Sequence, residues 1–177
     1  MQVQQQSSKQ STWQLDADHS SVEFSVKKLF FLTVSGRLTK LTGSIVLHED
    51  SLKDCSVEAT IGAASIDTGN QKRDAQVRST FLAVTDYPAI RFLSSEVGRG
   101  KDRDMLKVKG VLTIRDTNKD VVLDVTEVDR SRSPNGEEVI YYVAETELNR
   151  FDFGVNAWRG VVGQKLKVVI NVQANRV

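Results

Sequence analysis

The sequence has few of the residues from which most catalytic and metal centres are built. Its 177 residues include one cysteine, Cys55, and two histidines, His19 and His48. A single cysteine excludes an intramolecular disulfide, and no metal-ligand spacing links the two histidines. The chain also lacks a glycine-rich phosphate loop, a Gly-x-Ser-x-Gly motif and a nucleotide-binding fingerprint. These absences favour a binding protein over an enzyme and predict neither a cofactor nor a metal.

The sequence also lacks an excess of charge of either sign and lacks long apolar runs. The 24 basic residues nearly balance 23 acidic ones, and a net charge of +1 gives no overall field to attract nucleic acid or an anionic membrane. Residues 1–11 are rich in Gln and Ser and contain no signal peptide or membrane anchor. We predict a disordered polar tail over residues 1–11 and a single domain over 12–177. The missing signal predicts a cytoplasmic location for the chain as given, and a periplasmic or secreted one if a signal has been removed.

The sequence does contain apolar residues that alternate with polar ones along most of the chain. This period of two is typical of strands that have one apolar side and one polar, solvent-facing side. Turn sequences separate the strands, including an Asn135-Gly136 pair suited to a hairpin. About eight antiparallel strands are expected, the number at which a closed barrel is either filled by side chains or holds one small ligand. The alternating segments are residues 22–26, 45–47, 57–61, 90–92, 106–114, 121–125, 140–144 and 166–172.

One helix is expected to interrupt this pattern, over residues 68–83. Thr68 or Asn70 can cap its start, and Asp74 precedes Arg78 by four residues, an order that stabilises a helix surface. A single helix across a barrel mouth can be a plug or a lid, and the periodicity does not distinguish the two.

From Trp13 to the C-terminus, the sequence resembles the YceI-like, or polyisoprenoid-binding, proteins. The resemblance is strongest over residues 65–94 and continues at the Phe151-Asp152-Phe153-Gly154 segment. The chain departs from the family pattern at Lys28-Leu29 and Gln76-Val77, where the family has His-Leu, and at Thr80-Phe81, where it has Asp-Phe. The matching elements are Ser65-Ile66-Asp67-Thr68, Arg73-Asp74, Arg78-Ser79, Tyr87-Pro88 and Phe92-x-Ser94.

The resemblance implies an all-β, lipocalin-like antiparallel barrel with one inserted α-helix and an apolar tunnel. Its expected function is the non-enzymatic binding, sequestration or transport of a long amphiphilic lipid, of polyprenyl or quinone type. The partner would be this hydrophobic molecule, with no nucleic acid, no integral membrane segment and a homodimer allowed. The residues predicted to contact the ligand are Phe24, Val26, Phe30, Phe31, Ile61, Val77, Phe81, Phe92, Leu112, Phe153 and Trp158, with Arg73, Gln76 and Arg78 as polar contacts.

Several of these residues also have a plain structural interpretation. The charges of Arg73, Asp74 and Arg78 are more ordinarily explained as pinning the helix to its neighbours. Trp158 either closes the core or forms a flat wall against the ligand. Phe30 and Phe31 either belong to the core or form an apolar surface at the barrel entrance that contacts the ligand or a membrane.

The histidine and cysteine residues have structural interpretations as well. His19, beside Asp16 and Asp18, is interpreted as structural rather than as part of a metal or acid–base site, and Cys55 as passive. Two alternative functions remain: an interaction module with a filled core, and a small barrel enzyme using Tyr141 or Tyr142 with Asp124.

Overall fold

The chain folds into antiparallel strands and a few short helical segments. The computed structural model describes residues 9–177. Helix α1 spans Gln71–Gln76 and continues as a π-helical turn, η4, over Val77–Phe81; the 3₁₀ turns are η1 (Ala17–His19), η2 (Leu52–Asp54), η3 (Ala63–Ser65) and η5 (Arg150–Phe153). The strands are β1 (Gln10–Leu15), β2 (Ser21–Lys28), β3 (Leu32–Leu38), β4 (Leu41–His48), β5 (Ser56–Gly62), β6 (Ile66–Asp67), β7 (Ala89–Arg99), β8 (Met105–Ile114), β9 (Thr117–Arg132), β10 (Glu138–Asn149) and β11 (Val162–Arg176).

Eight of these strands close into a barrel, as predicted. The order is β1-β4-β5-β7-β8-β9-β10-β11, and β11 pairs back to β1 through Leu15 and Ala174. Strand β2 continues the line of β1 beyond η1 and pairs with the same β11, while β3 and β6 extend the sheet from β2. Closure leaves no exposed edge among these eight strands, and the sheet ends instead at β6, which pairs with β3 at Arg37 and Leu38.

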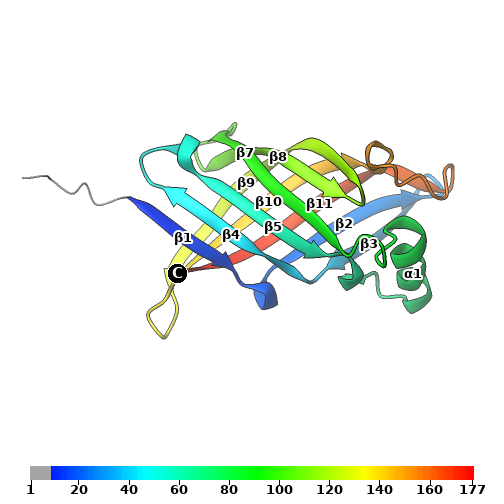
Figure 1. Cartoon of the computed structure of the whole chain (residues 1–177), viewed down its shortest axis with the longest axis horizontal. Helices are drawn as coiled ribbons and strands as arrows, with labels where there is room; N and C mark the ends of the chain where they lie inside the picture. The colour runs from blue at the N-terminus through cyan, green and yellow to red at the C-terminus, as the bar shows by residue number, and fades with distance from the viewer. Residues whose placement is uncertain (1–8) are drawn as a thin grey trace, which may run out of the picture.

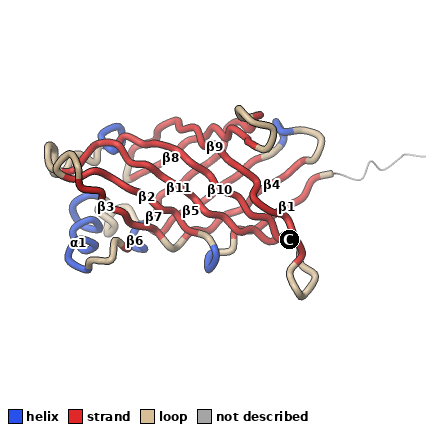
Figure 2. The backbone as a smooth tube through the Cα atoms, turned by 180° about the vertical axis from the view of Figure 1, so that it is seen from behind, coloured by secondary structure: helices blue, strands red, loops and turns tan. Residues whose placement is uncertain are grey.

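The barrel is elongated, and its two ends differ (Figures 1 and 2). At one end lie α1, the β2–β3 turn and the long β10–β11 connection; we call this the helix end. At the other lie the β4–β5, β7–β8 and β9–β10 connections; we call this the hairpin end. Both views place α1 at one end and the C-terminus at the other.

Alternation along each strand turns one row of side chains into the barrel. On β10, Tyr142, Ala144 and Leu148 face the interior, whereas Glu145 and Glu147 are exposed. The most deeply buried apolar residues, including Trp13 and Ile140, belong to a large core cluster within the strands. A Cβ at Gly36 would lie 2.7 Å from the Phe24 ring of the neighbouring strand, so a larger residue there would require that ring to shift.

The helical insertion is shorter than the predicted 68–83. Asn70, rather than Thr68, caps α1 by accepting a hydrogen bond from the Arg73 backbone N–H at 3.0 Å. Thr68 is instead engaged with Asp74, and the wider π turn ends where Leu82 N–H donates to the Val77 carbonyl at 2.9 Å. The backbone φ of Ala83 is +47°, so a regular helix cannot continue through it.

Strands β1 and β3 were not among the predicted segments. Strand β1 begins at Gln10, so the predicted boundary between tail and domain at residues 11 and 12 falls inside a strand. Gln10 and Ser11 pair with His48 and Leu47 of β4, which fixes them in the barrel wall. The remainder of the predicted tail, apart from Lys9, lies outside the described residues.

Candidate ligand-binding site

A large cavity runs through the barrel. Its volume is about 850 Å³, within the range of pockets that enclose small ligands. Its middle is lined by apolar side chains from every strand of the ring, such as Val57, Leu123 and Ile170. The lining reaches from Trp158 at the helix end to Leu52 at the hairpin end. The barrel interior is therefore not filled by its own side chains.

Most of the residues predicted from the sequence line this cavity. Phe30, Phe31 and Arg78 do not: the two phenylalanines lie exposed on the β2–β3 turn, and Arg78 turns towards the backbone. Their contact with a ligand remains a prediction that the geometry does not favour. Those that line the cavity are Phe24, Val26, Ile61, Val77, Phe81, Phe92, Leu112, Phe153, Trp158, Arg73 and Gln76.

Charge is distributed unevenly along the cavity. At the helix end, the charged lining residues are Lys28, Lys72, Arg73 and Arg150, and no carboxylate lines the cavity there among residues 9–177. The acidic lining residues Glu49, Asp104 and Glu127 all lie at the hairpin end, where Arg103 and Arg130 also line the cavity, so that end is mixed in charge. The helix end is thus the one that offers a positive environment to a polar head.

The helix itself is held by its charged residues, as the structural interpretation predicted. Asp74 is buried and accepts hydrogen bonds from the Thr68 backbone N–H at 2.9 Å and the Thr68 hydroxyl at 2.5 Å. These bonds, with the charges of Arg78 and Arg73, lower the pKa of the Asp74 carboxyl, so it is ionised at neutral pH. Arg78 donates to the carbonyls of Ala64 and Ile66, each at 3.0 Å. Both side chains therefore serve to fix α1 and η4 against the barrel.

Arg73 both holds the segment before the helix and lines the cavity. Its guanidinium donates to the Thr68 hydroxyl and carbonyl, both at 2.8 Å. Gln76 lies one helical turn further along and also lines the cavity. The helix therefore closes part of the barrel mouth and turns polar groups towards it.

Arg150 is the main feature of the site that the sequence did not reveal. The residue is only 4% exposed, and it lines the cavity at the start of η5. Burial, with the nearby charge of Arg159, lowers the pKa of the guanidinium. Its hydrogen bonds go to four backbone carbonyls of the β10–β11 region: Gly163 at 2.9 Å, Val155 at 2.8 Å, Ala157 at 2.6 Å and Val162 at 2.8 Å.

These bonds fix the connection that carries Trp158. The Trp158 ring lies 6.3 Å from the Phe81 ring of η4, measured between centroids, and the residue is 44% exposed. The guanidinium of Arg150 also lies 5.6 Å from the centroid of Phe81. Trp158 is thus a wall of the cavity mouth, half open to solvent, rather than part of a closed core.

At the hairpin end, polar groups face the cavity. Burial, and the Glu127 carboxylate, raise the pKa of Tyr142 to about 12, so its hydroxyl stays protonated and can donate a hydrogen bond. Arg130 donates two hydrogen bonds to Glu127, at 3.0 and 2.7 Å. Cys55 contacts the backbone of His48 rather than its imidazole, and the buried Nδ1 of His48 has no hydrogen-bond partner among residues 9–177.

The residues considered for catalysis are not assembled there. Asp124 is exposed on the outer face of β9, and Tyr141 does not line the cavity. Tyr142 does line it, but a hydroxyl with a pKa of about 12 is a poor base at neutral pH. In the described part of the chain, no three His, Cys, Asp or Glu side chains gather as a metal site would require.

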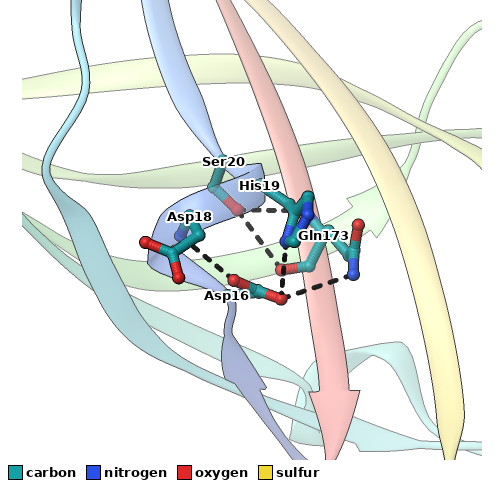
Figure 3. Close-up of polar contacts among 5 residues, drawn as sticks. All are labelled: Asp16, Asp18, His19, Ser20 and Gln173. Carbon is teal, nitrogen blue, oxygen red and sulfur yellow. Dashed lines mark hydrogen bonds and ion pairs between the residues drawn. The ribbon is translucent and has the colours of Figure 1, made fainter.

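His19 has a structural place at the corner between β1 and β2 (Figure 3). Its Nδ1 lies 2.9 Å from Asp16 Oδ2, while Asp16 also accepts from the Asp18 backbone N–H at 3.0 Å. The Ser20 hydroxyl donates to the Gln173 carbonyl at 3.3 Å and accepts from its backbone N–H at 3.1 Å. This network joins the corner to β11.

The fold and cavity define the class: an extended, lipocalin-like antiparallel barrel enclosing an apolar tunnel. The YceI-like domain family matches residues 13–174, and the chain belongs to that family. Over residues 9–177, no helix is long and apolar enough to cross a membrane.

Known relatives and structures agree with this assignment. Protein YceI of Shigella flexneri is 28% identical over 159 residues, covering 89% of this chain and 82% of the relative. The crystal structure of BcnA from Burkholderia cenocepacia matches with a TM-score of 0.80 at 20% identity, over 90% of this chain and 98% of that one. The structure of a polyisoprenoid-binding domain from Saccharophagus degradans, implicated in plant cell wall breakdown, matches with a TM-score of 0.71 at 15% identity. The match covers 93% of this chain and 98% of that one. At these identities, the two structural matches show the fold alone.

Proposed function

We propose that this protein binds and carries a long apolar amphiphile, of isoprenoid type, without catalysing its conversion. The observation that carries the proposal is the elongated cavity of about 850 Å³ with apolar walls along its middle. A structural relative of the same fold is described as polyisoprenoid-binding, which supports the same class of ligand.

Binding follows from removing the lipid chain from water. Each buried methylene contributes roughly 0.8 kcal/mol, so affinity rises with chain length until the cavity is full. The middle of the wall is apolar, so it does not fix the position of the chain and allows different tails. Specificity for the tail is therefore loose.

The head group binds at the helix end. Lys28, Lys72 and Gln76 line the mouth and have no hydrogen-bond role comparable to that of Arg150. Because no carboxylate lines this mouth in the described residues, an anionic or hydrogen-bond-accepting head is favoured there over a cationic one.

Trp158 should report entry of the ligand. Titrating a polyprenyl lipid in detergent is expected to change its fluorescence saturably, because it lines the cavity and is 44% exposed. Trp13 is 2% exposed and lies outside the lining, so a Trp158→Phe variant should lose the response while a Trp13→Phe variant keeps it. A wild-type protein that gives no saturable response with short, medium or long chains would contradict the proposal.

A further inference from the structure

Exposed apolar side chains gather at the helix end. Phe30 is 91% exposed and Phe31 is 75% exposed, values unusual for side chains of this size. Six of the ten large apolar residues exposed in the described chain lie on two segments there, 27–32 and 158–162. The helix-end patch consists of Leu29, Phe30, Phe31, Leu32, Trp158 and Val161.

The two segments are neighbours in space. Lys28 pairs with Val162 between β2 and β11, and the Leu29 backbone N–H donates to the Val161 carbonyl at 2.8 Å. The connections that carry them lie together at the same end of the barrel (Figure 1). The patch is therefore one surface rather than two isolated turns.

Strained backbone holds these side chains outward. The φ angles of Leu29, Phe30 and Trp158 are +51°, +70° and +58°, in the left-handed region that disfavours residues with a side chain. Each such residue costs on the order of 1 kcal/mol. A folded chain retains such strain most often where it serves a function.

The charge of the two segments is of one sign. Residues 27–32 and 158–162 contain Lys27, Lys28 and Arg159 and neither Asp nor Glu. Although the whole chain has a net charge of only +1, these two segments present cations beside aromatic and aliphatic side chains. That combination is typical of surfaces that enter the interface of an anionic lipid bilayer.

We propose that the helix-end patch docks on a lipid bilayer that carries anionic head groups. The Phe30–Phe31 turn presents two aromatic side chains that are 91% and 75% exposed, which suits insertion between lipid head groups. A stable protein interface would instead require a broad and complementary surface. Lys27 and Arg159 then lie at the level of the lipid phosphates, where each is attracted to the surface.

Docking in this orientation would bring the cavity mouth to the bilayer. Lys28, Trp158 and Val162 belong to the same two segments and line the cavity. An apolar ligand could then pass between bilayer and barrel with little exposure to water. This transfer step rests on the proposed function, whereas the docking itself does not.

Co-sedimentation with vesicles tests the docking. The vesicles are made of phosphatidylcholine alone or mixed with phosphatidylglycerol, without any polyprenyl lipid. The wild-type protein is expected to bind the mixed vesicles, and a Phe30→Ser, Phe31→Ser double variant to bind them at least about tenfold more weakly. A Leu93→Ser variant is the matched control, because Leu93 is 61% exposed on β7, away from the patch.

Charge and folding are controlled separately. A Lys27→Gln, Arg159→Gln variant should also bind the mixed vesicles more weakly, and added salt should weaken wild-type binding. The double phenylalanine variant should keep the circular dichroism spectrum and thermal unfolding of the wild type, which shows that it is folded. The Lys27→Gln, Arg159→Gln variant, changed at two residues outside the cavity lining, should keep the Trp158 fluorescence response to a polyprenyl lipid in detergent, which separates docking from ligand binding. Absence of wild-type binding to mixed vesicles, or equal binding by the double phenylalanine variant, would overturn the proposal. Patch-dependent self-association without vesicle binding would overturn it in favour of a protein partner.

Discussion

Replacing Ala144 with phenylalanine is expected to lower the affinity for a long polyprenyl lipid by about 100-fold. Ala144 lies in the middle of β10, faces the cavity and is 5% exposed. The added ring would occupy space that the lipid chain otherwise fills. Displacing about four methylene groups corresponds to roughly 3 kcal/mol of lost burial, since each contributes about 0.8 kcal/mol.

The matched control is Glu145→Phe, which places the same ring on the outer face of the same strand, where Glu145 is exposed. It should bind the lipid as the wild type does. The measurement is a fluorescence titration with short and long polyprenyl lipids, accompanied by thermal unfolding to confirm that both variants are folded. A folded Ala144→Phe variant with unchanged affinity for the long lipid would show that the chain does not pass through the barrel.

Replacing Arg150 with methionine is expected to lower the free energy of unfolding by about 3 to 4 kcal/mol. Methionine fills much of the same space but leaves four backbone carbonyls of the β10–β11 region without their donor. An unsatisfied buried polar group costs about 1 to 3 kcal/mol, and partial access of water to some of these carbonyls reduces the sum. Denaturant unfolding followed by circular dichroism measures the change.

Arg159→Met is the comparison for this second change. Arg159 is exposed, donates one hydrogen bond, to Asn156 at 3.3 Å, and has its guanidinium 4.2 Å from the centroid of the Phe151 ring, so its loss should cost about 1 kcal/mol. Equal effects of the two substitutions would show that burial and the carbonyl contacts of Arg150 do not stabilise the fold.

Much of the architecture could be predicted because alternation is a direct consequence of strand geometry. Segments such as 166–172 reveal a buried face through period two alone. Strand β3 also alternates, with Leu32, Val34 and Leu38 on one side, but Gly36 interrupts this apolar row, and the consecutive apolar residues 29–32 obscure where the strand begins. Strand β1 was not predicted because it is short and follows a Gln-rich stretch.

The site could be predicted only in outline. Inward apolar residues such as Phe92 and Leu112 are required by a filled barrel and by a hollow one alike, so alternation cannot determine the cavity. Arg150 gives no local signal either: the sequence Asn149-Arg150-Phe151 is compatible with an exposed turn. Its contacts arise only when the β10–β11 connection folds back over the barrel mouth, where carbonyls of residues 155–163 converge on one guanidinium.

The exposed Phe30–Phe31 turn illustrates a related limit. The sequence indicated either core or an entrance, because consecutive apolar residues fit both. The choice depends on the left-handed backbone at Leu29 and Phe30, which directs the rings away from the barrel. Neither residue is one that usually adopts this conformation, so local propensity favours the opposite outcome.

Native mass spectrometry of the protein purified without delipidation tests most directly whether the barrel carries a lipid. We expect a non-covalent adduct whose mass, after solvent extraction, identifies an isoprenoid chain with its head group. Ala144→Phe should reduce the adduct and Glu145→Phe should not. A bare chain that also fails to take up polyprenyl lipids added in detergent would contradict the carrier function.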